Sequence, residues 1–127
     1  MDHVWVTLLY GSLSALLVGA LGVNVSRLRV GKQAFVGAAQ DPELTQAVRA
    51  HGNATEYVPL QILLLLLLEL SGVSGMPLHL LGGLIFTSRL LHAVGVLLQL
   101  RVTALAALVS YLVTFAMAIW GLVIHFR

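Results

Sequence analysis

Hydrophobic residues dominate four long segments of the chain, and short polar breaks separate these segments. They cover residues 4–26, 54–73, 76–100 and 102–126. The first and last contain no charged side chain, whereas the second carries Glu56 near its start and Glu69 near its end, and the third carries Arg89 and His92. About 20 helical residues cross the hydrocarbon core of a bilayer, so each segment predicts a transmembrane helix.

The breaks predict short connections between antiparallel helices. Asp41-Pro42-Glu43 has the pattern of a helix start, because Asp41 can cap, Pro42 suits the first turn and Glu43 favours the positive end of the dipole. The second helix is therefore expected to begin near residue 42, ahead of its lipid-embedded part. Residues 72–77, with two glycines and a proline, and residues 99–101 form the other breaks. We expect an all-α integral membrane protein, a four-helix antiparallel bundle forming a single domain over residues 1–127.

Composition agrees with this fold class and excludes several functions. Hydrophobic residues make up 59% of the 127 residues and charged residues only 9%, which argues against a water-soluble enzyme. A formal charge of +2 is too small for a nucleic-acid surface, so no nucleic-acid partner is expected. Because the chain has no cysteine, any sulfur chemistry must come from a ligand.

The basic residues predict the orientation in the membrane. Most of them flank the first and third connections: Arg27, Arg29, Lys32, Arg49 and Arg101. The positive-inside rule therefore places these connections in the cytoplasm and both termini outside. The N-terminal sequence Met1-Asp2-His3 has no basic region, which favours a retained span over a cleaved signal peptide.

The second helix has a polar face near its cytoplasmic end. Arg49, Asn53 and Glu56 fall within an arc of about 60° on a helix, so a cation, an amide and a carboxylate occupy successive turns. Such a face can recognise a zwitterion. A face of interfacial salt bridges with neighbouring helices is the alternative, and the spacing alone leaves both open.

Arg89 and His92 share one face of the third helix. An arginine within the bilayer costs about 2.5 to 3.5 kcal/mol on insertion scales, so Arg89 needs protein or water around it. Glu56 is the expected partner, and a structural ion pair is favoured over direct catalysis by either residue. His92 has no metal-ligating neighbours at suitable spacing.

Small residues recur every four positions in the outer helices. They are Gly11, Ala15 and Gly19 in the first helix, and Ala106, Ser110, Thr114 and Ala118 in the fourth. Small side chains let helix backbones approach closely in lipid. This pattern fits packing within one bundle and packing between subunits equally well.

These residues together resemble a known family. The segment Arg49-Ala50-His51-x-Asn53-x-x-Glu56-Tyr57-x-Pro59, followed by Arg89-x-x-His92, resembles the MAPEG family, the membrane-associated proteins in eicosanoid and glutathione metabolism. The short connections are similar to its small bacterial branch, which implies the bacterial inner membrane. The resemblance also implies a homotrimer with glutathione held between neighbouring subunits at the cytoplasmic end.

The family pattern implies roles for the residues that match it. Arg49 and Arg27, with Arg29 as the alternative to Arg27, would pair with the carboxylates of glutathione. Asn53 would bind its peptide, and Glu56 would meet the ammonium or hold an arginine. His51, Tyr57, Arg89 and His92 belong to the same binding motif, His92 as a wall residue.

The implied activity is that of a glutathione-dependent transferase or peroxidase. A cation near the thiol increases the thiolate population, and the thiolate would attack a lipophilic electrophile that enters from the lipids. Arg101 is the candidate activating residue, since Gln99-Leu100-Arg101 resembles the leukotriene-forming pattern with a shortened connection, whereas a gapless comparison with the prostaglandin branch puts Leu105 at that position. Val96 stands where eicosanoid-forming relatives have tyrosine, so a phenol is excluded at that position.

Two other functions fit parts of the pattern. The first is a non-catalytic membrane protein that binds glutathione or an anionic lipid head group with the same arginines. The second is a small multidrug exporter, a class that depends on a carboxylate in the first helix. Residues 4–26 contain no carboxylate, which argues against the exporter.

Overall fold

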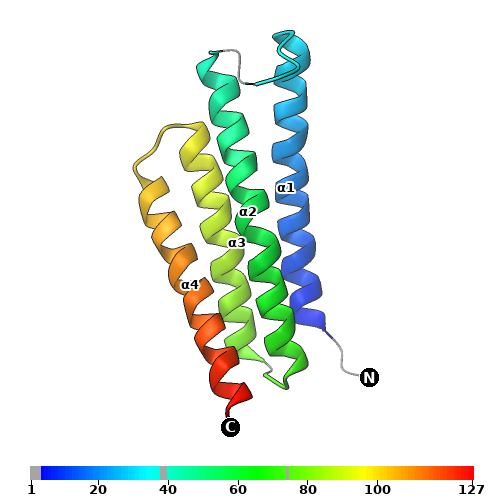
Figure 1. The fold of residues 1–127 in the computed structure, drawn as a ribbon, viewed down its shortest axis with the longest axis vertical. Helices are drawn as coiled ribbons and strands as arrows, with labels where there is room; N and C mark the ends of the chain where they lie inside the picture. The colour runs from blue at the N-terminus through cyan, green and yellow to red at the C-terminus, as the bar shows by residue number, and fades with distance from the viewer. Residues whose placement is uncertain (1–3, 38–39, 74) are drawn as a thin grey trace.

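All four predicted helices are present in the computed structural model, which describes residues 4–37, 40–73 and 75–127. They are α1 (Trp5–Gly31), α2 (Pro42–Leu70), α3 (Met76–Leu97) and α4 (Val102–His125) (Figure 1). Each is long and apolar enough to cross a membrane. The all-α membrane bundle expected from the hydrophobic pattern is therefore confirmed.

The starts of the inner helices follow local sequence signals. Asp41 caps α2, its Oδ1 accepting from the backbone N–H of Leu44 at 2.8 Å, and Pro42 is the first helical residue as predicted. Glycines in the left-handed region, Gly72 at φ 87° and Gly75 at φ 71°, form the turn between α2 and α3. The α2 helix itself continues through Pro59.

Two helix ends differ from the predicted spans. The first helix continues past Ser26 to Gly31, so Arg27 and Arg29 lie on a helix and not in a connection. Charged side chains outside the lipid do not interrupt backbone hydrogen bonding, which is why the change in polarity does not end the helix. The third helix ends at Leu97, three residues before the predicted limit at Leu100, and Gln99 adopts φ 55° in the following turn.

The α2–α3 pair forms the centre of the bundle. The α1 helix packs against α2 and α3, α4 packs against α3 and α2, and α1 and α4 do not contact each other in the described residues. Figure 1 shows α1 and α4 on opposite sides, with the α1–α2 connection reaching beyond the α3–α4 connection at one end. The start of α1 and the end of α4 lie at the other end. The end with these two connections is the predicted cytoplasmic end.

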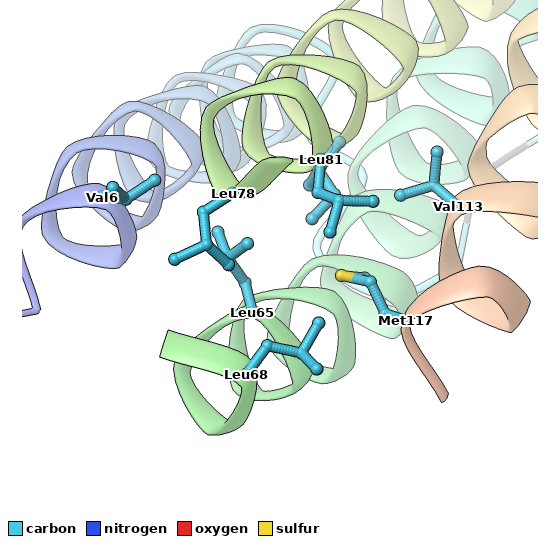
Figure 2. Packing of buried hydrophobic residues seen from close by; sticks show 8 residues of the cluster. Val6, Leu65, Leu68, Leu78, Leu81, Val113 and Met117 are labelled. Carbon is cyan, nitrogen blue, oxygen red and sulfur yellow. The ribbon is translucent and has the colours of Figure 1, made fainter. Parts of the chain in front are cut away.

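The largest apolar core lies toward the opposite end. It joins all four helices through side chains shown in Figure 2 and listed here: Val6, Leu65, Leu68, Leu78, Leu81, Ile85, Val113 and Met117. Large apolar side chains such as Leu16 and Phe115 are exposed on the outside, where lipid would surround them. Since lipid is as apolar as leucine, close packing and hydrogen bonds supply most of the association energy.

Buried polar contacts tie α4 to the centre. The Nε2 of Gln61 donates to Ser110 Oγ at 2.7 Å and to Thr114 Oγ1 at 2.9 Å. The small-residue pattern of α4 thus serves packing within the bundle, one of the two possibilities left open above. On α1, by contrast, Ala15 and Gly19 are exposed and only the half-buried Gly11 lies against α2, at Ile62, so most of that pattern is not used inside this chain.

Candidate functional site

A depression lined by both apolar and charged or polar side chains opens between α2 and α3 toward the predicted cytoplasmic end. Its volume is about 510 Å³, and its lining consists of Val48, Arg49, Gly52, Asn53, Glu56, His92 and Val96. Four of the residues that the sequence singled out, Arg49, Asn53, Glu56 and His92, therefore border one space. The α2 residues converge because positions three or four apart lie on the same face of a helix.

The charges in this depression do not neutralise each other. Arg49 and Glu56 are both exposed, and no salt bridge joins them within the described residues. Asn53 lies one turn from each of them, and the half-buried His92 faces them from α3. A cation and a carboxylate that are both available, with an amide between them, suit a ligand carrying charges of both signs.

Arg89 lies behind this surface. Its side chain is 2% exposed, and its Nη1 donates to Asn53 Oδ1 at 2.8 Å. The prediction that Arg89 forms an ion pair with Glu56 is wrong, because no salt bridge joins these two side chains among the described residues. Asn53 is the side chain that bonds Arg89 of α3, whereas Glu56 is exposed at the border of the depression.

Two tyrosines, Tyr57 and Tyr111, lie next to Arg89 and to each other. The guanidinium carbon of Arg89 lies 5.1 Å from the centre of the Tyr57 ring, within the range of a cation–π interaction. The hydroxyl groups of Tyr57 and Tyr111 are 3.2 Å apart. Tyr111 could not be predicted from the sequence because it lies in a charge-free apolar helix. The packing of α4 on α2 brings its hydroxyl group to Tyr57.

The remaining candidates on α1 and α2 do not reach the depression in this chain. Arg27 donates to Asn24 Oδ1 at 3.1 Å on α1. Arg29 donates to the carbonyl oxygens of Ala34 at 3.1 Å and Gly37 at 2.7 Å, so it stabilises the α1–α2 connection.

His51 faces α1 and not the depression. A Cβ built on Gly22 would lie 3.2 Å from His51 Nε2, which explains why a glycine suits that position. Arg101 is the exposed residue directly before α4 and is not part of the lining, whereas Val96 is.

A salt-bridge cluster closes the α1–α2 connection above the depression. Lys32 Nζ contacts Asp41 at 2.8 Å and Glu43 at 3.1 Å. The hydrogen bond from Lys32 holds the pKa of Asp41 below its ordinary value, and the hydrogen bond to Asp41 raises the pKa of Lys32. This cluster joins the end of α1 to the start of α2.

Four membrane-length helices with a depression lined by charged side chains at one end define a small multi-pass membrane protein with a candidate polar site. The MAPEG family model matches residues 7–123. The chain is also 39% identical over 90 residues to the inner membrane protein YecN of Escherichia coli K12, covering 71% of this chain and 69% of that protein. The same values hold for YecN of E. coli O6:H1 strain CFT073.

The chain therefore belongs to the MAPEG family. The family resemblance drawn from the second-helix motif is confirmed. Membrane-length helices, together with the likeness to an inner membrane protein, make it a multi-pass protein of the bacterial inner membrane.

Proposed function

We propose that the depression between α2 and α3 binds glutathione and that the protein uses it in a transferase or peroxidase reaction. The observation that carries this proposal is the convergence of Arg49, Asn53, Glu56 and His92 on one space. Glutathione has two carboxylates, an ammonium group, peptide bonds and a thiol. The lining offers a guanidinium for a carboxylate, a carboxylate for the ammonium and an amide for the peptide.

The location of the depression suits chemistry at a membrane surface. It opens near the predicted cytoplasmic end, so a water-soluble peptide can enter from one side and a lipophilic electrophile from the bilayer. In one chain the depression is open, and a homotrimer in which a neighbouring subunit covers it is part of the proposal. Arg27 would then be available to a neighbouring site.

The reaction would begin with ionisation of the thiol, whose proton passes to water. A thiol with a pKa near 8.5 is only a few per cent ionised at neutral pH, so a nearby cation is needed to populate the thiolate. The sulfur lone pair then forms a bond to the electrophilic atom, and the leaving group departs with the electron pair of its bond. Arg101 is the proposed activating residue, because its exposed side chain lies at the same end of the bundle.

Binding without activation is the second candidate function. Two observations favour it: Val96 puts an apolar side chain in the depression, and Arg101 is outside the lining. In that case the protein would hold glutathione, or an anionic head group, without ionising a thiol.

An ultraviolet difference titration of the detergent-purified protein with glutathione tests the proposal. A saturable thiolate band supports the enzyme, whereas bound glutathione without the band supports the second candidate. Arg49→Ala should weaken binding by about 1.5 to 3 kcal/mol through loss of a charged hydrogen bond. Arg127→Ala, the same charge change at the opposite end of the bundle, is the matched control. If wild-type protein binds no glutathione in equilibrium dialysis, the proposed function is wrong.

A further inference from the structure

The contact between Arg89 and Asn53 fixes the orientation of an amide that borders the depression. A guanidinium group has five N–H donors and no acceptor, so only the oxygen of the amide can face it. Arg89 Nη1 and Asn53 Oδ1 are 2.8 Å apart, which is the length of a strong charge-assisted hydrogen bond. The NH2 group of Asn53 must therefore point away from Arg89.

The Asn53 NH2 group is available to a ligand. Within the described ranges, Asn53 Nδ2 donates no hydrogen bond, although the residue borders the depression. A turned amide would bring donors of Asn53 and Arg89 face to face, which is unfavourable in a buried position. The side of Asn53 that meets the depression is thus a donor.

Arg89 itself is held firmly in place. It is 2% exposed, and the Tyr57 ring lies 5.1 Å from its guanidinium carbon, with Tyr57 in turn bonded to Tyr111. No carboxylate pairs with it among the described residues, and its Nε has no hydrogen-bond partner there. An uncompensated positive charge therefore lies one side chain behind the depression, where it favours an electron-rich group on the ligand.

We propose that Arg89 is a positioning residue that holds the Asn53 amide with its NH2 group toward the depression, so that Asn53 recognises a carbonyl or carboxylate oxygen of the bound peptide. This inference rests on the proposed function and adds to it the residue that fixes the orientation of the Asn53 amide. Arg89 does not touch the ligand in this arrangement. It acts through Asn53.

The chain offers an internal control for a direct test. Its two asparagines are Asn24 and Asn53, and the side-chain oxygen of each accepts from an arginine, Arg27 and Arg89 respectively. Only Asn53 borders the depression. Selective isotope labelling of the asparagine side-chain nitrogen gives two sets of amide signals in the NMR spectrum, one from a residue that borders the depression and one from a residue that does not.

The experiment titrates glutathione into the labelled full-length protein while calorimetry measures binding in parallel. We expect a saturable shift of the Asn53 N–H signals that exceeds any shift of the Asn24 signals. If calorimetry shows binding and the Asn53 signals respond no more than those of Asn24, the inference is wrong and the proposed function stands. If calorimetry shows no binding to the wild-type protein, the proposed function is wrong and the inference with it.

Substitutions separate positioning from a general structural role. Asn53→Asp keeps the shape and gives Arg89 a carboxylate, so the fold should persist while glutathione affinity falls about tenfold or more, because a donor becomes an acceptor. Arg89→Met, in which an apolar side chain of similar length replaces a buried cation, should fold and lose the Asn53 shift. Arg89→Lys keeps a donor and should restore part of that shift. An Arg89→Met protein with wild-type affinity and an unchanged Asn53 response would overturn the positioning role.

Discussion

The carboxylate of Glu69, near the end of α2, caps the start of α1 by accepting from the backbone N–H of Thr7 at 2.8 Å through Oε2. Its other oxygen accepts from Val6 N–H at 2.9 Å. These amides belong to the first turn of α1, where no residue within the helix can accept from them. The negative charge also meets the positive end of the helix dipole. Glu69 of α2 therefore caps α1, and the cap joins the two helices.

Glu69→Ala should destabilise the bundle. Two charged hydrogen bonds are lost and two buried amides lose their acceptors, so we expect a loss of roughly 1 to 3 kcal/mol in the free energy of unfolding. The measurement is unfolding in mixed detergent micelles followed by circular dichroism. Glu56→Gln removes the same charge from the same helix at an exposed position without a capping contact, and it should leave unfolding unchanged. An equal effect of both substitutions would contradict the capping role.

The amide of Gln61 and the hydroxyl of Ser110 should be energetically coupled. Both side chains are completely buried, and Gln61 Nε2 donates to Ser110 Oγ at 2.7 Å. Gln61→Met preserves most of the volume, and Ser110→Ala removes only the hydroxyl. A double-mutant cycle should yield a coupling of about 0.6 to 1.7 kcal/mol, the range observed for hydrogen bonds between membrane helices. Strictly additive losses in the same unfolding measurement would show that this contact contributes no net stability.

The contact between Lys32 and Asp41 should appear in the titration of Asp41. Its pKa lies below the ordinary 3.8 because Lys32 and the Leu44 N–H stabilise the carboxylate. A carboxylate with a lowered pKa contributes stability above its ordinary pKa and loses that contribution as the pH falls through the lowered value. We therefore expect the α1–α2 connection to loosen only under strongly acidic conditions.

The check is an NMR titration of the Asp41 carboxyl carbon. Lys32→Ala should move the Asp41 pKa up toward 3.8, and high salt should do the same to a smaller extent, because the pair is exposed to solvent. Arg27→Ala removes a nearby cation that bonds Asn24 instead, so it should leave the Asp41 titration unchanged. Equal Asp41 pKa values in wild-type and Lys32→Ala proteins would exclude the proposed cause.

The parts of the site that lie on one helix could be predicted from the sequence, and the contacts between helices could not. Arg49, Asn53 and Glu56 share a face because helical geometry fixes their relative directions. Which of them contacts Arg89 depends on the rotation of α2 about its axis. The side chains of Asn53 and Glu56 leave the helix in similar directions, so the sequence alone does not decide between them. Charge favoured Glu56 in the prediction, whereas packing of α2 on α3 brings Asn53 to Arg89.

The fold could be predicted from the sequence more completely than the site, for a physical reason. Membrane helices must satisfy their backbone hydrogen bonds internally, so long apolar segments specify helices with few alternatives. Turn residues such as Gly72 and Gly75 then mark the boundaries. The pairing of Tyr57 with Tyr111 carries no comparable signal, since it arises from the register between two helices that are distant in the sequence.

Arg101→Ala should separate binding from activation. Arg101 is exposed and outside the lining of the depression, so its loss should change glutathione affinity little. If its guanidinium stabilises the thiolate, the variant should lose the thiolate band and most conjugation of a chlorodinitrobenzene electrophile at neutral pH.

Its activity should then rise with pH toward about 8.5, where a thiol ionises without assistance. Arg127→Ala is the control, and it should keep the wild-type band and pH profile. If Arg101→Ala keeps both as well, another group activates the thiol. If wild-type protein binds glutathione but shows no band, the site is one for binding alone, as the apolar Val96 in its lining would favour.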